Sequence, residues 1–106
     1  MYYTYMIRCE DNSIYTGITT DVQRRWKEHK DKSERCAKYT MRHSVKKLES
    51  LWSTETRILA SKLEYQIKTL KKSEKEHLIK TQNLSLFFEQ KLSCEEYKVE
   101  KIKNLI

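Results

Sequence analysis

Two tyrosines and the only glycine of the chain could form a site near the N-terminus. If a three-residue loop follows Cys9, Cys9 faces Ser13 and Tyr5 faces Gly17 across a hairpin. Because cross-strand partners share a face, Tyr5, Tyr15 and Gly17 then lie together, and the glycine lets a group approach the backbone beside two phenols. Two alternatives stay open: Gly17 relieves a bulge or bend, or a two- or four-residue loop separates the tyrosines.

The segment after the hairpin offers a cation and an imidazole. Arg25 lies one helical turn beyond Val22 and could clamp a phosphate through its guanidinium. The alternative is an exposed arginine beside an exposed Arg24. His29 could act as a general base, or it could pack beside Trp26 with both ring nitrogens satisfied.

A carboxylate and a short polar segment complete the set of candidates. Glu64 borders an apolar stripe on a predicted helix and could hold a hard cation such as Mg²⁺. The alternative is an ordinary surface ion pair with Lys68, four residues on. Lys38, Tyr39 and Thr40 combine a cation, an aromatic ring and a hydroxyl, as a segment that binds a nucleic-acid backbone would, although solvated loops have the same composition.

The elements that position these residues follow from residue pattern. Strands are expected at 2–8 and 14–19, then a helix at 21–30 capped by Thr20 with Gln23. Residues 31–43 read as an irregular loop. The segment 45–52 is expected as a strand, although its apolar spacing also permits a helix.

The second half of the chain is expected to be helical. A long helix should run over 55–71 from a cap at Thr54, and a shorter one should reach Lys80 from the Ser73 and Glu76 capping box. An apolar run covers 84–88, and Ser93 with Glu96 predicts a last helix at 95–106.

This order, β-β-α-β-α-α and then α, predicts an α+β fold with a three-stranded mixed or antiparallel sheet flanked by helices. We expect a domain over 1–80 and a helical extension over 81–106 packed on it. The alternative is that the extension binds a partner or a second copy through the apolar strip Tyr97, Ile102, Leu105 and Ile106.

Composition limits the functional classes. The 106 residues carry a net charge of +7, which favours nucleic acid as a partner, although a solvated lysine surface gives the same balance. No apolar run approaches the roughly 18 residues that span a bilayer, and no signal segment opens the chain, so a cytoplasmic location and no membrane are expected. Three widely spaced cysteines predict reduced thiols.

The tyrosine and glycine segments resemble a known family. Tyr3-Thr4-Tyr5 and Tyr15-Thr16-Gly17 are similar to the paired motifs of the GIY-YIG nuclease superfamily, although only Tyr5 matches within the first motif. The wider string YYTYMIRCEDNSIYTGITTDVQRRWKEH, with AKYT and LEYQIKTLKKSEKEHLI further on, resembles the small single-domain bacterial members, a group of putative endonucleases. The resemblance covers about residues 2–80.

Carried over position by position, the resemblance assigns roles to five residues. The two motif tyrosines fall on Tyr5 and Tyr15, the helix arginine on Arg25 and the metal-binding glutamate on Glu64. His29 matches a histidine common in the subgroup. These imply catalytic roles for Tyr5, Tyr15, Arg25 and His29.

The implied activity is metal-dependent hydrolysis of DNA phosphodiester bonds with low sequence specificity. Glu64 would bind Mg²⁺ or Mn²⁺, Arg25 would stabilise phosphoryl charge, Tyr15 would be the general base and Tyr5 would hold Tyr15 by a hydrogen bond. A free phenol has a pKa near 10, so a tyrosine base needs cations nearby. Some superfamily members carry a lysine directly after the motif glycine, where this chain has Ile18.

The expected partner is DNA, with branched and single-stranded forms and RNA as further candidates. The expected nucleic-acid contacts are Gly17, Arg24, Lys38, Tyr39 and Lys68. A module that binds structured DNA or RNA without cutting it is the alternative function. The oligomeric state is left open between a monomer and a weak homodimer.

Overall fold

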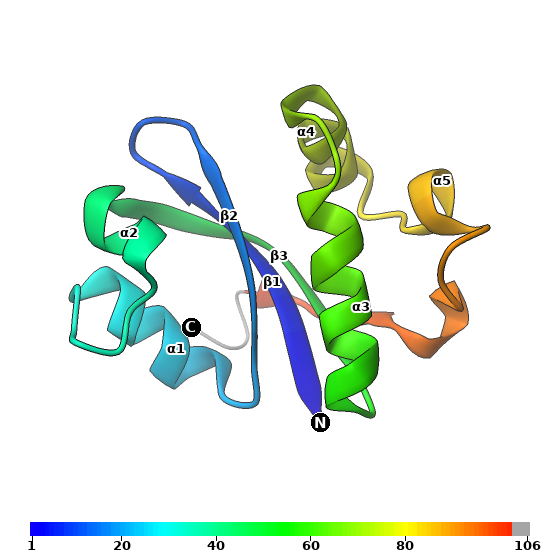
Figure 1. Cartoon of the computed structure of the whole chain (residues 1–106), viewed down its shortest axis with the longest axis horizontal. Helices are drawn as coiled ribbons and strands as arrows, with labels where there is room; N and C mark the ends of the chain where they lie inside the picture. The colour runs from blue at the N-terminus through cyan, green and yellow to red at the C-terminus, as the bar shows by residue number, and fades with distance from the viewer. Residues whose placement is uncertain (103–106) are drawn as a thin grey trace.

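The computed structural model describes residues 1–102 and has an antiparallel sheet with helices on both faces (Figure 1). The strand order is β2-β1-β3-β4, with bounds β1 (Tyr2–Cys9), β2 (Ile14–Thr19), β3 (Val45–Thr54) and β4 (Lys98–Val99). The α+β prediction is confirmed. The sheet has four strands where three were expected, because the two-residue β4 pairs with the end of β3.

Within residues 1–102, five α-helices flank this sheet. On one side lie α1 (Val22–Lys30) and α2 (Lys38–Arg42); on the other lie α3 (Arg57–Lys68), α4 (Lys72–Thr81) and α5 (Ser85–Phe88) (Figure 1). None of the helices in the described part of the chain combines the length and apolarity needed to cross a membrane.

The predicted hairpin register is confirmed. Tyr5 pairs with Gly17 and Ile7 with Tyr15, and the Cys9 amide donates to the Ser13 carbonyl over 2.9 Å. Asn12 closes the turn at φ 71°, a left-handed conformation that asparagine tolerates. The register runs through Gly17 without a shift, so this glycine does not relieve a bulge.

Alternation along β1 builds two separate cores. Tyr5 and Ile7 point to the α1 side and are buried with Val22. Met6 points to the opposite side, where it is buried with Trp52 and residues of α3, α4 and α5. Because β1 is central and covered on both faces, a site residue on β1 is held between two cores.

Several helix starts differ from the prediction by a few residues. The cap of α1 is Asp21, whose carboxylate accepts the Arg24 amide over 3.1 Å, and the cap of α3 is Thr56. Helix α4 begins at Lys72, where Glu74 accepts the Lys71 amide over 2.8 Å. Neighbouring Ser, Thr and Asp residues can each cap a helix, so local sequence leaves the choice among them open.

Two larger differences concern α2 and the C-terminal segment. The predicted loop at 31–43 contains α2, and the predicted helix at 95–106 is wrong over 95–102, where a 3₁₀ turn (Cys94–Glu96) precedes β4. The rest of that predicted helix lies outside the described residues. Tyr97 is buried and donates its hydroxyl to the Leu59 carbonyl over 2.6 Å, which ties this segment to α3.

Candidate active site

The Tyr5 phenol occupies the space that Gly17 leaves open. A Cβ atom at Gly17 would lie 2.5 Å from the Tyr5 oxygen and 2.7 Å from its Cζ atom, so no larger residue fits beside the buried ring. The group that approaches this backbone is therefore the phenol of the cross-strand partner. Contact of Gly17 with nucleic acid stays a prediction.

His29 joins Tyr5 to α2 through a buried chain of hydrogen bonds. Its Nε2 lies 2.8 Å from the Tyr5 oxygen and its Nδ1 lies 2.7 Å from the Thr40 hydroxyl. Thr40 donates to the Ala37 carbonyl over 3.1 Å, so its oxygen accepts from His29 Nδ1–H. The Nε2 atom is then the acceptor, and Tyr5 donates to it.

Burial sets the protonation states along this chain. It lowers the pKa of His29 to about 4, and the nearby Arg25 charge acts in the same direction, so the imidazole is neutral at physiological pH. Burial first, and Tyr15 second, raise the pKa of the Tyr5 phenol well above its usual range. This geometry favours the packed interpretation of His29 over a general base.

Tyr15 lies at the exposed side of this cluster, on the edge strand β2. Its ring centroid is 5.4 Å from that of His29, and it stacks on Tyr39 of α2 at 5.7 Å and 25°. The Lys68 ammonium lies 5.9 Å from the Tyr15 ring centroid, on the opposite side from α2. Among the described residues, none forms a hydrogen bond with the Tyr15 hydroxyl. The expected hydrogen bond from Tyr5 to Tyr15 is absent, because the Tyr5 hydroxyl donates to His29 instead.

Arg25 is held beside Tyr5 and is not an exposed side chain. It is 21% exposed, bonds the Glu28 carboxylate at 2.9 Å and also bonds the Arg35 carbonyl. Arg25 lines one small cavity with Tyr5 and His29, and its charge opposes the rise in the pKa of Tyr5. A partly exposed guanidinium at this point can still meet a phosphate oxygen.

Glu64 reaches the cluster from α3. Its carboxylate lies 3.4 Å from the Lys68 ammonium, so the predicted surface ion pair is present, and its charge also raises the pKa of Tyr5. The ion-pair interpretation of Glu64 is therefore present in the structure. Its role as a metal ligand stays a prediction.

The donor set fits a magnesium-type ion bound together with substrate. Mg²⁺ commonly takes one or two carboxylates, keeps several waters and completes its shell with substrate phosphates. Glu64, with a side chain 25% exposed, offers one such carboxylate. Among residues 1–102, no group of three or more His, Cys, Asp or Glu side chains is placed to enclose a metal.

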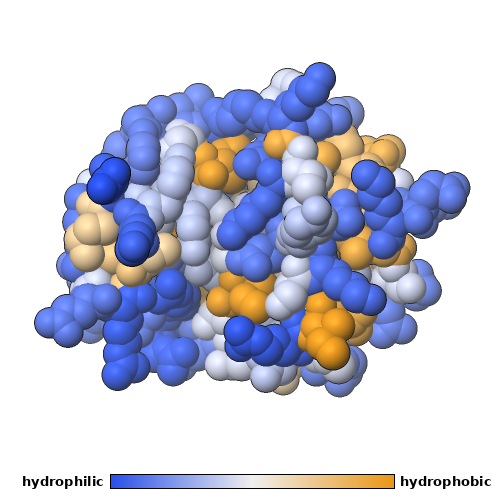
Figure 2. Space-filling view, in the orientation of Figure 1, coloured by the Kyte–Doolittle hydropathy of each residue, from blue (hydrophilic) through white to orange (hydrophobic). Residues whose placement is uncertain are grey.

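The structure brings most of the predicted residues together and leaves two at the rim. Arg24 is 57% exposed and lies 3.9 Å from Glu28, and Lys38 is exposed at the start of α2. The face carrying β2 and α3 is mostly hydrophilic, with hydrophobic patches among the polar side chains (Figure 2). Both rim cations are therefore open to a long polyanion.

Sequence reasoning did not find His43. Its ring stacks on Tyr39 at 4.2 Å and its Nδ1 lies 2.5 Å from an Asp11 oxygen in the hairpin turn. The role of Thr40 was also missed, since it was expected to face a nucleic acid and instead binds His29. Only the fold brings residues 11 and 43 together, so spacing carried no signal for this contact.

Comparison with known proteins identifies the family of this chain. A family model described as the GIY-YIG catalytic domain matches residues 1–77. The chain is 46% identical over 78 residues to the UPF0213 protein FN1575 of Fusobacterium nucleatum, covering 74% of this chain and 76% of that protein. It is 40% identical over 78 residues to the UPF0213 protein BH0048 of Halalkalibacterium halodurans, covering 74% and 81%.

The chain therefore belongs to the GIY-YIG family, whose fold is of the nuclease type. Its relatives are small bacterial proteins of a single domain. The solution NMR structure of the UPF0213 protein BH0048 from Bacillus halodurans aligns with a TM-score of 0.50 and 37% identity, over 88% of this chain and 98% of that one.

Proposed function

We propose that this protein is a metal-dependent endonuclease that hydrolyses DNA phosphodiester bonds with Tyr15 as general base. The observation that carries the proposal is the placement of Tyr15 on an open edge strand, between Tyr39 on one side and Lys68 with Glu64 on the other. Family membership supports the same activity.

The tyrosines have different tasks in this mechanism. Tyr5 is buried and donates a hydrogen bond to His29, so it is a positioning residue that shapes the floor of the site. Tyr15 has its hydroxyl free of bonds to the described residues and would take a proton from the attacking water. The Lys68 ammonium, 5.9 Å from the Tyr15 ring centroid, places a positive charge beside this phenol.

Two cations on different helices would stabilise the negative charge of the phosphate. Arg25 on α1 would bind a non-bridging oxygen, and Lys68 on α3 would supply the cation that Ile18 does not. Glu64 would hold Mg²⁺ or Mn²⁺, which when bound polarises the phosphate and stabilises the leaving oxygen. Lys68 would exchange its ion pair with Glu64 for a contact with phosphate.

Cleavage of supercoiled plasmid tests this proposal. We expect wild type to cut with Mg²⁺ or Mn²⁺ and to stop with EDTA, and Glu64→Gln to lose cutting by about 100-fold or more. Glu55→Gln is the matched control, because Glu55 is exposed at the turn before α3. Equal cutting by Glu64→Gln and wild type would refute the assignment of Glu64.

The second candidate is a module that binds nucleic acid without cutting it. The Glu64–Lys68 ion pair favours it, because the ammonium occupies the carboxylate that the metal would need. Under this alternative, wild type cuts no substrate with either metal, and binding weakens with salt equally in wild type and Glu64→Gln. The plasmid assay and a binding titration together separate the two functions.

A further inference from the structure

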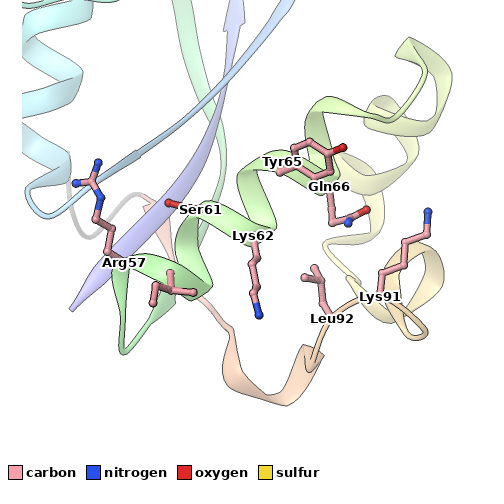
Figure 3. A pocket seen from close by; sticks show the side chains of 8 residues that line it. Arg57, Ser61, Lys62, Tyr65, Gln66, Lys91 and Leu92 are labelled. Carbon is pink, nitrogen blue, oxygen red and sulfur yellow. The ribbon is translucent and has the colours of Figure 1, made fainter.

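An open groove lies on the outer side of α3, apart from the cluster around Tyr15. It encloses about 520 Å³ between α3 and the segment that follows α5. Figure 3 shows Lys62 and Tyr65 extending from α3, with Leu92 and Lys91 of the later segment on the side of Lys62 and Gln66, whereas the Arg57 side chain extends from the start of α3 away from Lys91. The mechanism above uses none of these side chains.

The groove is positively charged. Arg57, Lys62 and Lys91 line it, and none of its lining residues in the described part of the chain is acidic. None of the three cations forms an ion pair with a described residue, in contrast to Lys68 and Lys72, which pair with Glu64 and Glu76. Three uncompensated cations around one groove favour a polyanion as its ligand.

An exposed aromatic ring stands among these cations. Tyr65 is 67% exposed, and Ile58, which also lines the groove, is 69% exposed, although side chains of this size are usually buried in a core. Proteins that bind single-stranded nucleic acid combine a cationic groove with aromatic rings on which bases stack. A blunt duplex offers no such base, because its bases are already stacked and paired.

The groove adjoins the candidate active site around the surface of α3. Tyr65 directly follows Glu64, and Ser61, which also lines the groove, precedes Glu64 by three residues and Tyr65 by four. Residues three and four apart are neighbours on a helix surface. A nucleic-acid strand that leaves the site at Glu64 therefore reaches the groove by passing Ser61.

We propose that this groove binds a single-stranded segment of the nucleic acid that flanks the scissile phosphate. Arg57, Lys62 and Lys91 contact its phosphates and Tyr65 stacks on a base. The inference rests on the proposed function, because it takes Glu64 as the place of cutting. A second copy of this chain is a poorer occupant, since a symmetric contact would bring two sets of these cations together.

Binding without metal tests the groove independently of cutting. The probe is a fluorescent single-stranded oligonucleotide, compared with a blunt duplex of the same sequence, both in EDTA. We expect Tyr65→Ala to weaken single-strand binding by about 5- to 100-fold and duplex binding by less than about twofold, whereas Tyr65→Phe retains both. Tyr65 is mostly exposed, so these variants should fold.

A matched pair of lysine variants tests the phosphate contacts. Lys62→Gln should reduce the slope of log affinity against log salt for the single strand by about 0.7. Lys46→Gln, at an exposed lysine of β3 outside the groove, should leave the slope unchanged. Equal slopes for the two variants, or equal single-strand affinity for Tyr65→Ala and wild type, would overturn the proposal.

Three further outcomes are distinguishable. A mass near twice 12.9 kDa that Tyr65→Ala halves, with unchanged nucleic-acid affinity, would overturn the proposal and assign the groove to self-association. If wild type cuts nothing but Tyr65→Ala still weakens single-strand binding selectively, the nuclease function fails and the groove stands. If cutting depends on Glu64 but Tyr65→Ala binds the single strand as wild type does, the nuclease function stands and the groove proposal fails.

Discussion

At the scale of single residues, the site depends on one glycine and one histidine that need not touch substrate. Gly17 leaves the space in which the Tyr5 ring lies. His29 accepts a hydrogen bond from Tyr5, and Thr40 orients the imidazole through a second hydrogen bond. These contacts hold Tyr5 as a neutral donor beneath Tyr15. The two tyrosines, 6.3 Å apart between ring centroids, therefore differ in burial and in chemistry.

Replacing Gly17 by alanine should displace the Tyr5 ring. Its Cβ would lie 2.5 Å from the Tyr5 oxygen, and the ring is buried and hydrogen-bonded, so we expect a loss of about 1–3 kcal/mol in the free energy of unfolding. Urea unfolding measures this loss. In a double-mutant cycle with Tyr5→Ala, the two losses should not add, because Tyr5→Ala removes the clash. Additive losses would show that the clash is not the cause.

His29 should make stability depend on pH in a defined window. Its pKa is lowered to about 4 in the folded protein, against about 6.5 when unfolded, so folding favours the neutral ring. The contribution is full above pH 6.5 and is lost as pH falls toward 4, on the order of 3 kcal/mol in all. Urea unfolding between these pH values should show a steeper loss for wild type than for His29→Gln, and parallel profiles would contradict the assignment.

At the scale of elements, ion pairs join the far end of the sheet to α4. Arg8 of β1 bonds Glu49 of β3 at 2.7 Å and Glu76 of α4 through two further bonds. Lys72, in the first turn of α4, also bonds the Asn12 carbonyl of the hairpin turn over 2.7 Å. Helix α4 therefore closes on the sheet through a guanidinium that spans two carboxylates.

Removing the Arg8 guanidinium should weaken this junction. We expect Arg8→Met to cost about 2–3 kcal/mol of unfolding free energy, because the mostly buried Glu49 is left with only Lys47 as a partner. Arg8→Lys should recover little, since one ammonium cannot span two carboxylates as a planar guanidinium does. Chemical denaturation measures both variants, and wild-type stability in Arg8→Lys would argue against the spanning geometry.

At the scale of the whole molecule, side chains between residues 84 and 97 are part of the main core. Leu84, Phe88 and Tyr97 are buried in one cluster with Met6 and Trp52. The segment also adds β4 to the sheet, and Glu100 accepts the Ser53 hydroxyl over 2.6 Å. We propose that the domain over 1–80 needs this extension in order to fold.

A fragment of residues 1–80 should therefore not fold stably by itself. Losing three buried apolar side chains removes about 5–8 kcal/mol, comparable to the total stability of a small domain of about 5–15 kcal/mol. Circular dichroism and the dispersion of amide NMR signals measure this. A cooperative unfolding transition in the 1–80 fragment would show that the extension is dispensable.

Local pattern predicted the hairpin register, the strand at 45–52 and the helices that carry Arg25 and Glu64. The hairpin turn, the period of two in the strands and the apolar stripe on α3 are encoded within a few residues of each other, so they can be read along the chain. The family resemblance identified Tyr5, Tyr15, Arg25, His29 and Glu64 as candidates. Their catalytic roles stay predictions.

Contacts between distant segments were decided only by the tertiary structure. Helix α2 has five residues and one buried side chain, Thr40, so it is too short to show a helical period of apolar residues. Contacts of α2 with His29 and Tyr15 stabilise it. Strand β4 has two residues, and β3 supplies its hydrogen-bond partners. The sequence alone determined which groups could do chemistry. Packing around β1 decided that Tyr5 donates a hydrogen bond to His29 and that Tyr15 faces Lys68. The physical reason is that burial and neighbouring residues set the protonation and orientation of a side chain.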